Sequence, residues 1–236
     1  GAAKINAINK IKKNLDNFIK YHYNYKSGKI IYKNNFIIFG NSKKKFKELI
    51  NEAYMNRVSL SSTGFYKTPK IHVNKKTLKG RPFLYFSYGA SVSEVIVDTL
   101  TGENKLTQVD ILHDVGKSIN PRIDIGQIEG GFTQGLGWLT TEQISWDKKG
   151  LLKTHSPSTY KIPTSSDLPK IFNVNIYEKG VNKENVINKS KAVGEPPLML
   201  ALSVFMALKD AIKDINQKSL NLKAPATAEN ILLNIN

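Results

Sequence analysis

The chain has 236 residues, of which 40 % are hydrophobic and 23 % are charged. This composition excludes a disordered chain, and the length suffices for one large domain or two small ones. The sequence contains no cysteine, which excludes disulfides, thiolate zinc sites, a cysteine nucleophile and an iron–sulfur cluster held by this chain alone. The longest apolar run, residues 196–208, is too short to cross a bilayer. Because the chain opens Gly-Ala-Ala, we expect a piece of a longer polypeptide.

The formal net charge is +16, from 35 basic and 19 acidic residues. A charge of this size is compatible with binding to nucleic acid or to an anionic membrane surface. However, the only arginines are Arg57, Arg81 and Arg122, whereas phosphate-binding surfaces usually rely on arginine. Lysine, isoleucine and asparagine are all abundant, as a compositional bias at exposed positions would produce. We therefore favour a solvated lysine-rich surface over a nucleic-acid interface.

The first half of the chain alternates between helical and extended patterns. Residues 4–20 have apolar positions at helical spacing, and residues 45–55 have the pattern of a short helix. Residues 29–32 and 36–39 are separated by Lys-Asn-Asn, as in a hairpin. β-branched and aromatic residues predict strands over residues 84–88, 94–98 and 107–113, with a turn at residues 101–104.

The second half is predicted to contain three helices and one strand. Helical spacing covers residues 123–141, and residues 172–178 alternate as in a strand. Pro197 is placed to begin a helix that continues from residue 198 to residue 215. A last helix follows Pro225, with Thr227 as its N-cap. The expected class is α+β, with a mostly antiparallel sheet and packed helices.

The first motif with possible chemistry is glycine-rich. Residues 126–137 read Gly-Gln-Ile-Glu-Gly-Gly-Phe-Thr-Gln-Gly-Leu-Gly, which fits neither the dinucleotide fingerprint nor a phosphate loop. Each glycine in a helix costs roughly 1 kcal/mol relative to alanine. Close approach of a ligand, or tight helix packing, would offset that cost, and the sequence leaves both open. We expect Gln127 near the start of the helix, where free N–H groups favour an anionic ligand.

The second motif places one carboxylate directly before an apolar helix. Residues 190–198 read Ser-Lys-Ala-Val-Gly-Glu-Pro-Pro-Leu, and the two prolines restrict the backbone after Glu195. Burial would raise the pKa of Glu195 towards the range of a general base, while the helix start would lower it. The alternative is a structural carboxylate that caps the helix or pairs with Lys191.

The histidines add no further site. None of His22, His72, His113 and His155 is spaced three or four residues from another, so we expect any metal to be held by a cofactor. Nothing indicates nucleophilic hydrolysis, because no Gly-x-Ser-x-Gly motif is present. A hydrogen bond at the strand end is the simplest role for His113 and Asp114.

With both motifs in view, the chain resembles the C-terminal part of the molybdenum-binding subunit in the xanthine dehydrogenase family of molybdenum hydroxylases. The segment 190–198 is the most specific part of the resemblance. Matching segments follow in order over essentially the whole chain, at residues 57–66, 110–116, 124–137, 157–163, 190–198 and 224–227.

The resemblance implies a molybdenum–pterin cofactor (molybdopterin) and a role for four residues. Glu195 would be the catalytic base, which takes a proton from the hydroxyl group on molybdenum. Gln127 would donate a hydrogen bond to an oxygen ligand of the metal, and Val193 and Gly194 would contact the cofactor through their backbone. In that family the remaining cofactor contacts and the purine-orienting residues lie upstream of the segment that matches Gly1. Residues 1–236 would then be the C-terminal portion of a cofactor-binding domain.

The resemblance also implies a reaction and partners. The expected activity is oxidation of hypoxanthine and xanthine to urate in purine catabolism, with water as the oxygen source. Electrons would pass through iron–sulfur clusters and FAD, on another domain or subunit, to NAD. The complete enzyme would be a cytoplasmic dimer without membrane attachment. The alternatives are a related enzyme acting on aldehydes or other N-heterocycles, a basic nucleic-acid-binding module, and a non-catalytic remnant.

Overall fold

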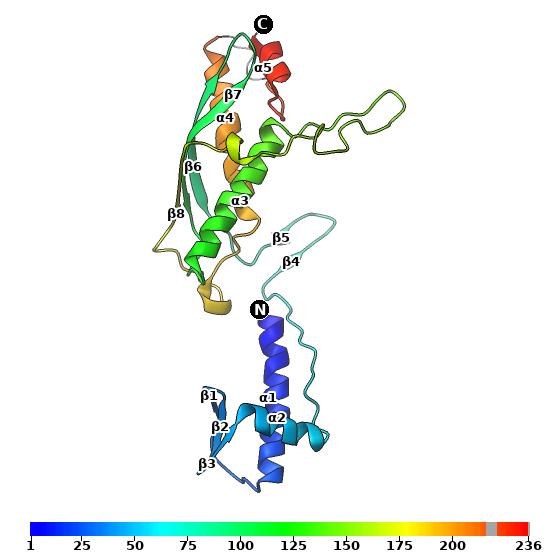
Figure 1. Cartoon of the computed structure of the whole chain (residues 1–236), viewed down its shortest axis with the longest axis vertical. Coiled ribbons are helices and arrows are strands. Elements are labelled where there is room, and N and C mark those ends of the chain that lie inside the picture. Colours follow the sequence, from blue (N-terminus) through cyan, green and yellow to red (C-terminus); the bar gives the residue numbers. More distant parts are fainter. Residues whose placement is uncertain (216–220, 236) are drawn as a thin grey trace. The chain divides into compact units, whose positions relative to one another are not determined.

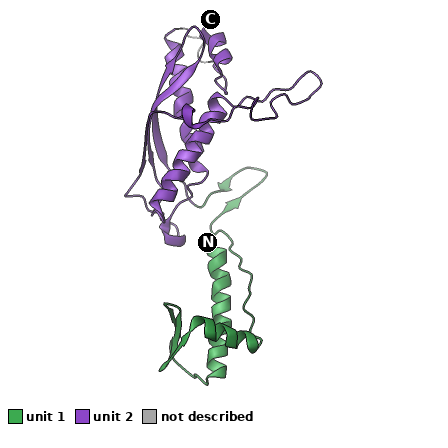
Figure 2. Cartoon of the chain, viewed as in Figure 1, with its two compact units in different colours: residues 1–84 green, residues 85–236 purple. Residues whose placement is uncertain are grey.

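A computed structural model describes residues 1–215 and 221–235 (Figure 1). The chain divides into two compact units, residues 1–84 and residues 85–236 (Figure 2). We predicted that residues 1–236 form the C-terminal portion of one cofactor-binding domain, and this stays a prediction. No helix in the described ranges is both long enough and apolar enough to cross a membrane.

Unit 1 is built on one long helix and a small antiparallel sheet. Buried side chains of α1 (Ala2–His22) pack with those of the sheet and of α2 (Phe46–Met55). The sheet has the order β1-β2-β3, formed by β1 (Ile31–Lys33), β2 (Phe36–Phe39) and β3 (Ser42–Lys45). The predicted helices and hairpin are therefore confirmed. The core consists of Leu15, Phe18, Ile19, Ile37, Phe39, Leu49 and Ala53.

The end of unit 1 is mostly extended. The segment after α2 runs along α1, where Asn14 and Lys10 donate hydrogen bonds to the carbonyl oxygens of Ser59 and Thr63. A short ladder follows, formed by β4 (His72–Val73) and β5 (Gly80–Arg81). Residues 84–88, predicted as a strand, are not in a strand. Instead, the hydroxyl groups of Tyr85 and Ser87 form hydrogen bonds with the backbone of Ala192.

Unit 2 contains a three-stranded sheet with the order β6-β7-β8. The strands are β6 (Gly89–Val97), β7 (Asn104–His113) and β8 (Ile171–Ile176). β6 and β7 pair antiparallel, but β7 and β8 pair parallel. All other ladders in the described residues are antiparallel, so the predicted class holds with one parallel pairing.

Helices cover one face of this sheet. α3 (Pro121–Thr140) and α4 (Leu202–Lys213) lie across it (Figure 1). The hydroxyl group of Ser203 on α4 contacts those of Ser91 and Ser93 on β6, each at 2.7 Å. The core between the layers includes Val109, Ile111, Ile128, Phe132, Val204, Leu208 and Ile212.

The helical segment after Glu195 differs from the prediction. Residues Pro196–Ala201 form a 3-10 helix, η3, and only then does α4 begin. The first bond of this segment is of the 3-10 type, from the N–H of Leu198 to the carbonyl oxygen of Glu195 at 3.2 Å. α5 (Ala228–Ile235) follows Pro225 as predicted, and the side chain of Thr227 accepts a hydrogen bond from the N–H of Asn230. This confirms the N-cap.

Candidate functional site

Gln127 lies on α3, but not at its start. Asn120 caps this helix through its side chain, which accepts from the N–H of Ile123 at 3.4 Å, and Pro121 is the first helical residue. Gln127 is therefore the seventh residue of α3. N–H groups are free only in the first turn of a helix, and the backbone of Gln127 lies beyond that turn. The predicted anion site at the helix start is wrong for Gln127, and its exposed side chain is the group available for contacts.

The glycines of α3 face two different environments. A Cβ on Gly131 would lie 3.1 Å from the Cβ of Pro197, and one on Gly135 would overlap the carbonyl oxygen of Leu198. These two glycines let η3 approach the helix closely, so tight packing explains them. Gly126 and Gly130 have nothing within 4 Å of the position that a Cβ would take. Internal packing therefore does not explain those two glycines.

The segment before Glu195 is tied to the end of β7. Ser190 pairs with Gly116 in an antiparallel bridge, and the N–H of Lys191 donates to the carbonyl oxygen of Val115 at 2.7 Å. The ammonium group of Lys191 lies 2.5 Å from a carboxylate oxygen of Asp114. Lys191 therefore pairs with Asp114, and the alternative in which it pairs with Glu195 is wrong.

A third segment, residues 85–88, also holds this loop. The N–H of Ala192 donates to the hydroxyl oxygen of Tyr85 at 3.1 Å. The hydroxyl group of Ser87 donates to the carbonyl oxygen of Ala192 at 2.9 Å. These contacts join residues more than a hundred positions apart, and no local pattern in the sequence indicated them.

The two sequence motifs meet at Gly194. The side-chain oxygen of Gln127 lies 3.5 Å from the position that a Cβ on Gly194 would occupy. Val193 packs against the core of unit 2, which fixes the loop next to the helix. The structure thus brings together Gln127, Val193 and Gly194, and Glu195 follows directly in the chain.

The carboxylate of Glu195 is free. Although Glu195 is the N-cap residue of η3, its side chain makes no capping hydrogen bond. It makes no hydrogen bond or ion pair with any described residue of the chain. The side chain is exposed, so the expected burial is not found in this chain. Neither structural alternative, capping or pairing, therefore accounts for the carboxylate.

The backbone around Glu195 has hydrogen-bond donors to spare. Within the described ranges, the N–H groups of Val193, Gly194 and Glu195 have no acceptor. A row of free N–H groups is a common way to bind an anionic ligand. This set and the Gln127 amide can donate hydrogen bonds to a polar, negatively charged cofactor, whereas the Glu195 carboxylate is suited to accepting a proton.

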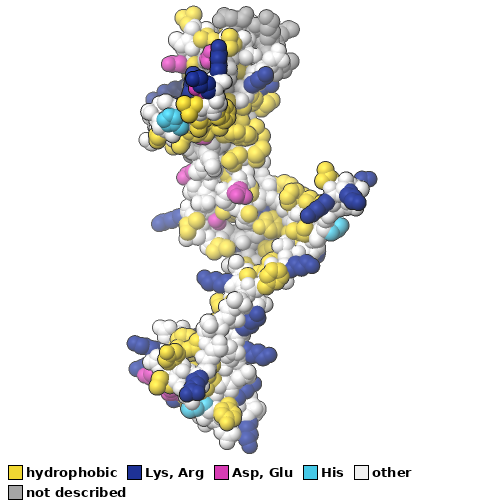
Figure 3. Space-filling view, turned by 90° about the vertical axis from the view of Figure 1, so that its right-hand side faces the viewer, with side chains coloured by type: hydrophobic (Ala, Val, Ile, Leu, Met, Phe, Trp, Pro, Cys, Tyr) yellow, Lys and Arg dark blue, Asp and Glu magenta, His cyan; other side chains and the backbone are white. Residues whose placement is uncertain are grey.

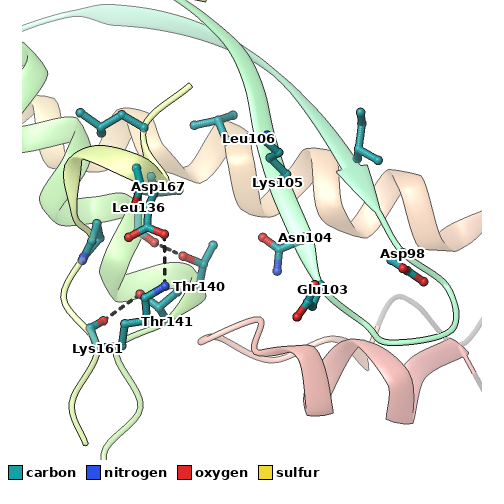
Figure 4. A pocket seen from close by; sticks show the side chains of 14 residues that line it. Asp98, Glu103, Asn104, Lys105, Leu106, Leu136, Thr140, Thr141, Lys161 and Asp167 are labelled. Carbon is teal, nitrogen blue, oxygen red and sulfur yellow. Dashed lines mark hydrogen bonds and ion pairs between the residues drawn. The ribbon is translucent and has the colours of Figure 1, made fainter. Parts of the chain in front are cut away.

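A cavity lies at the other end of α3 (Figure 4). Its volume is about 430 Å³, and it is lined by residues that include Thr140, Lys161 and Asp167. Thr140 is thirteen residues beyond Gln127, which is roughly 20 Å along a helix. The charged side chains Lys161 and Asp167 pair with each other at 3.1 Å. This cavity is therefore separate from the motifs.

His113 is the one buried histidine of the described ranges. It is 1 % exposed, and its Nδ1 has no hydrogen-bond partner among the described residues. The predicted bond with Asp114 is not formed, since one oxygen of Asp114 accepts from the N–H of Gly116 and the other binds Lys191. Burial lowers the pKa of His113 below its usual value.

Residues 1–169 match the molybdopterin cofactor-binding domain family. The chain belongs to this family. The resemblance drawn from the motifs, and molybdopterin as the cofactor of the family, are thereby confirmed. Gln127 lies within the matched residues, and Glu195 lies beyond them.

Named relatives of the chain are xanthine dehydrogenases. It is 50 % identical over 194 residues to xanthine dehydrogenase/oxidase of Felis catus, which covers 79 % of this chain and 14 % of the relative. The corresponding protein of Gallus gallus is 48 % identical over 196 residues, covering 81 % of the chain and 14 % of the relative. Xanthine dehydrogenase of Oryza sativa subsp. japonica is 46 % identical over 200 residues, covering 80 % and 14 %. The chain therefore spans about one seventh of the length of these relatives.

Solved structures share the fold at lower identity. CO dehydrogenase from Oligotropha carboxidovorans gives a TM-score of 0.68 at 21 % identity, covering 99 % of this chain and 28 % of that one. Quinoline 2-oxidoreductase from Pseudomonas putida 86 gives 0.65 at 22 % identity, covering 95 % and 28 %. These likenesses support the fold assignment.

Proposed function

We propose that this chain supplies part of the active site of a molybdenum hydroxylase that oxidises hypoxanthine and xanthine to urate, with water as the oxygen source. The observation that carries the proposal is the junction of the two motifs, where Gln127 meets Gly194 and the free carboxylate of Glu195 follows. The purine substrate is supported by the identity to relatives named xanthine dehydrogenase.

Each residue of the junction has a role that its chemistry allows. When bound, the molybdenum cofactor supplies the redox centre that accepts two electrons from the substrate. The amide group of Gln127 donates a hydrogen bond to an oxygen of that cofactor. The N–H groups of Val193 and Gly194 donate to its anionic groups, and the missing side chain of Gly194 leaves room for close approach.

Glu195 acts as the general base. A base must be free to accept a proton, and no group of the described chain occupies this carboxylate. The side chain takes the proton of the water-derived hydroxyl group that attacks the purine. It receives this proton on a carboxylate oxygen, Oε1 or Oε2, and later releases it to solvent. Pro196 and Pro197 restrict the backbone that follows, which fixes the point of the chain from which the Glu195 side chain extends.

The rest of the reaction needs other parts of an enzyme. We propose an upstream part of the molybdenum-binding subunit that completes the cofactor and purine contacts. Iron–sulfur clusters and FAD on a further domain or subunit pass the electrons to NAD. We also propose that the complete enzyme is a cytoplasmic dimer.

Binding to nucleic acid receives no support from the surface. On the face seen in Figure 3, Lys and Arg side chains are scattered over both units rather than gathered into one patch. We therefore do not propose a nucleic-acid-binding function.

The role of Glu195 is tested by Glu195→Gln in the chain assembled with its upstream portion and its electron-transfer partner. We expect xanthine-dependent turnover to fall by about three orders of magnitude or more, while the molybdenum content stays at the wild-type level. The matched control is Glu178→Gln, an exposed carboxylate of unit 2 outside the junction, which should leave turnover unchanged. Loss of molybdenum in Glu195→Gln would assign the residue a structural role instead.

A further inference from the structure

We propose that Lys191 is a positioning residue, whose buried ion pair with Asp114 holds the loop (residues 190–195) that places Gly194 beside Gln127 and Glu195 directly after it. The catalytic consequence of this inference rests on the proposed role of Glu195. The structural part, that the ion pair fixes the loop, stands on the geometry of unit 2 alone.

The ion pair is short and enclosed. The ammonium nitrogen of Lys191 lies 2.5 Å from a carboxylate oxygen of Asp114, and the two side chains are only 8 % and 13 % exposed. The described ion pairs Lys44–Glu52 and Lys161–Asp167 have side chains that are between 28 % and 60 % exposed. Exposed pairs contribute little to stability, whereas removal of one partner of a buried pair is strongly destabilising, because it leaves the other charge buried and uncompensated.

Both partners are fixed by further contacts. The second oxygen of Asp114 accepts from the N–H of Gly116 at 2.7 Å, and the N–H of Asp114 donates to the carbonyl oxygen of Tyr88 at 2.8 Å. The ammonium group of Lys191 lies 5.0 Å from the centre of the Tyr88 ring, within the range of a cation–π interaction. A Cβ on Gly180 would collide with the carboxylate of Asp114, so this glycine makes room for it.

The ion pair therefore joins three segments that are distant in sequence: the end of β7, residues 85–88 and the loop itself. Only three residues separate Lys191 from Glu195. Of these, Ala192 is bonded to Tyr85, and Val193 packs against the core. Among the described contacts of residues 190–195, this is the one ion pair. Its loss would leave the segment before Glu195 held only by uncharged contacts.

The downstream side of Glu195 is held differently. There η3 rests on Gly131 and Gly135 of α3 through apolar contacts. Glu195 thus lies between a segment held by the Lys191–Asp114 ion pair and a segment held by the packing of η3 on α3. A displacement of about 1 Å at a reacting group can reduce a rate on the order of a hundredfold, so a loosened upstream anchor should be visible in kcat.

The test uses Lys191→Met in the assembled enzyme, with Lys161→Met as the matched control at an exposed ion pair. Hydrogen exchange of the backbone amides of residues 190–192, whose N–H groups are hydrogen-bonded, reports on the loop without any need for activity. We expect these amides to exchange at least about tenfold faster in Lys191→Met, and at the wild-type rate in Lys161→Met. We expect kcat to fall about 10- to 100-fold, with KM and molybdenum content nearly unchanged.

Two further variants separate positioning from general stability. Lys191→Arg keeps the charge and should recover most of the lost kcat. The double variant Lys191→Met with Asp114→Leu replaces the buried charges by apolar groups, which commonly restores stability. If the pair positions Glu195, the double variant regains the melting temperature of the wild type, but its kcat stays low. If kcat recovers together with stability, or if the amides of residues 190–192 exchange at the wild-type rate in Lys191→Met, the inference is overturned.

The outcome is separable from that of the proposed function. Full turnover in Glu195→Gln would refute the catalytic role of Glu195. The exchange rates in Lys191→Met would still decide whether the ion pair fixes the loop.

Discussion

Alanine at Gly135 should force η3 away from α3, whereas alanine at Gly130 should not. A Cβ on Gly135 would overlap the carbonyl oxygen of Leu198 and lie 2.8 Å from the Cβ of Ala201. Overpacking of this kind costs about 1–3 kcal/mol. Both variants gain the usual advantage of alanine over glycine in a helix, about 1 kcal/mol. That gain cancels in the comparison, so Gly135→Ala should be about 1–3 kcal/mol less stable than Gly130→Ala.

The comparison is made by urea-induced unfolding of both variants and the wild type, followed by far-UV circular dichroism. Gly130→Ala should be slightly more stable than the wild type, because the position that its Cβ takes has no neighbour within 4 Å. Equal stability of the two variants, within about 0.5 kcal/mol, would show that η3 does not approach α3 as closely as described. The account of how Glu195 is held on its downstream side would then be wrong.

Three further predictions concern His113, Asn120 and Thr227. Burial lowers the pKa of His113 below 6.5 in the folded state, so the unfolded chain binds the proton first as the pH falls. Stability should therefore be fully present above pH 6.5 and decline below it by up to about 1.4 kcal/mol per pH unit. His113→Leu should flatten the dependence of stability on pH between pH 7.5 and pH 5.5, which are about one pH unit on either side of the usual pKa. An unchanged dependence on pH would contradict the assignment of this effect to His113. Asn120→Ala should destabilise the chain by about 1 kcal/mol through loss of the α3 cap, and Asn120→Ser should retain most of the stability. Thr227→Ala should cost a similar amount, about 1 kcal/mol, at α5; denaturation midpoints that do not move would exclude either cap as a stabilising contact.

Periodicity predicted most of the regular elements, because each helix or strand buries one face. It placed α1, α2, α3, the unit 1 hairpin, β7 and β8 within a few residues of their bounds, whereas β6 begins five residues before its predicted start at residue 94. It was wrong for residues 84–88, where strand-forming residues are used differently. Tyr85 and Ser87 bind Ala192, and such long-range contacts leave no local pattern.

The sequence marked the two elements of the candidate site but not their geometry, and the roles of the site residues stay predictions. The motif around Glu195 and the glycines around Gln127 marked both elements, and the structure brings them together at Gly194. The burial of Glu195 was overestimated because the apolar residues after it point into the core, whereas its own side chain does not. The partner of Lys191 could not be predicted either, since Asp114 lies 77 positions away in the chain.

The central claim is that the junction of Gln127, Gly194 and Glu195 forms part of a molybdenum hydroxylase site. The most direct measurement is xanthine-dependent NAD reduction, with molybdenum content determined on the same sample of the assembled enzyme. The account predicts bound molybdenum together with turnover. Bound molybdenum without turnover would contradict the purine substrate and direct the search to aldehydes and other N-heterocycles. A properly folded complex with neither metal nor turnover would contradict the claim itself.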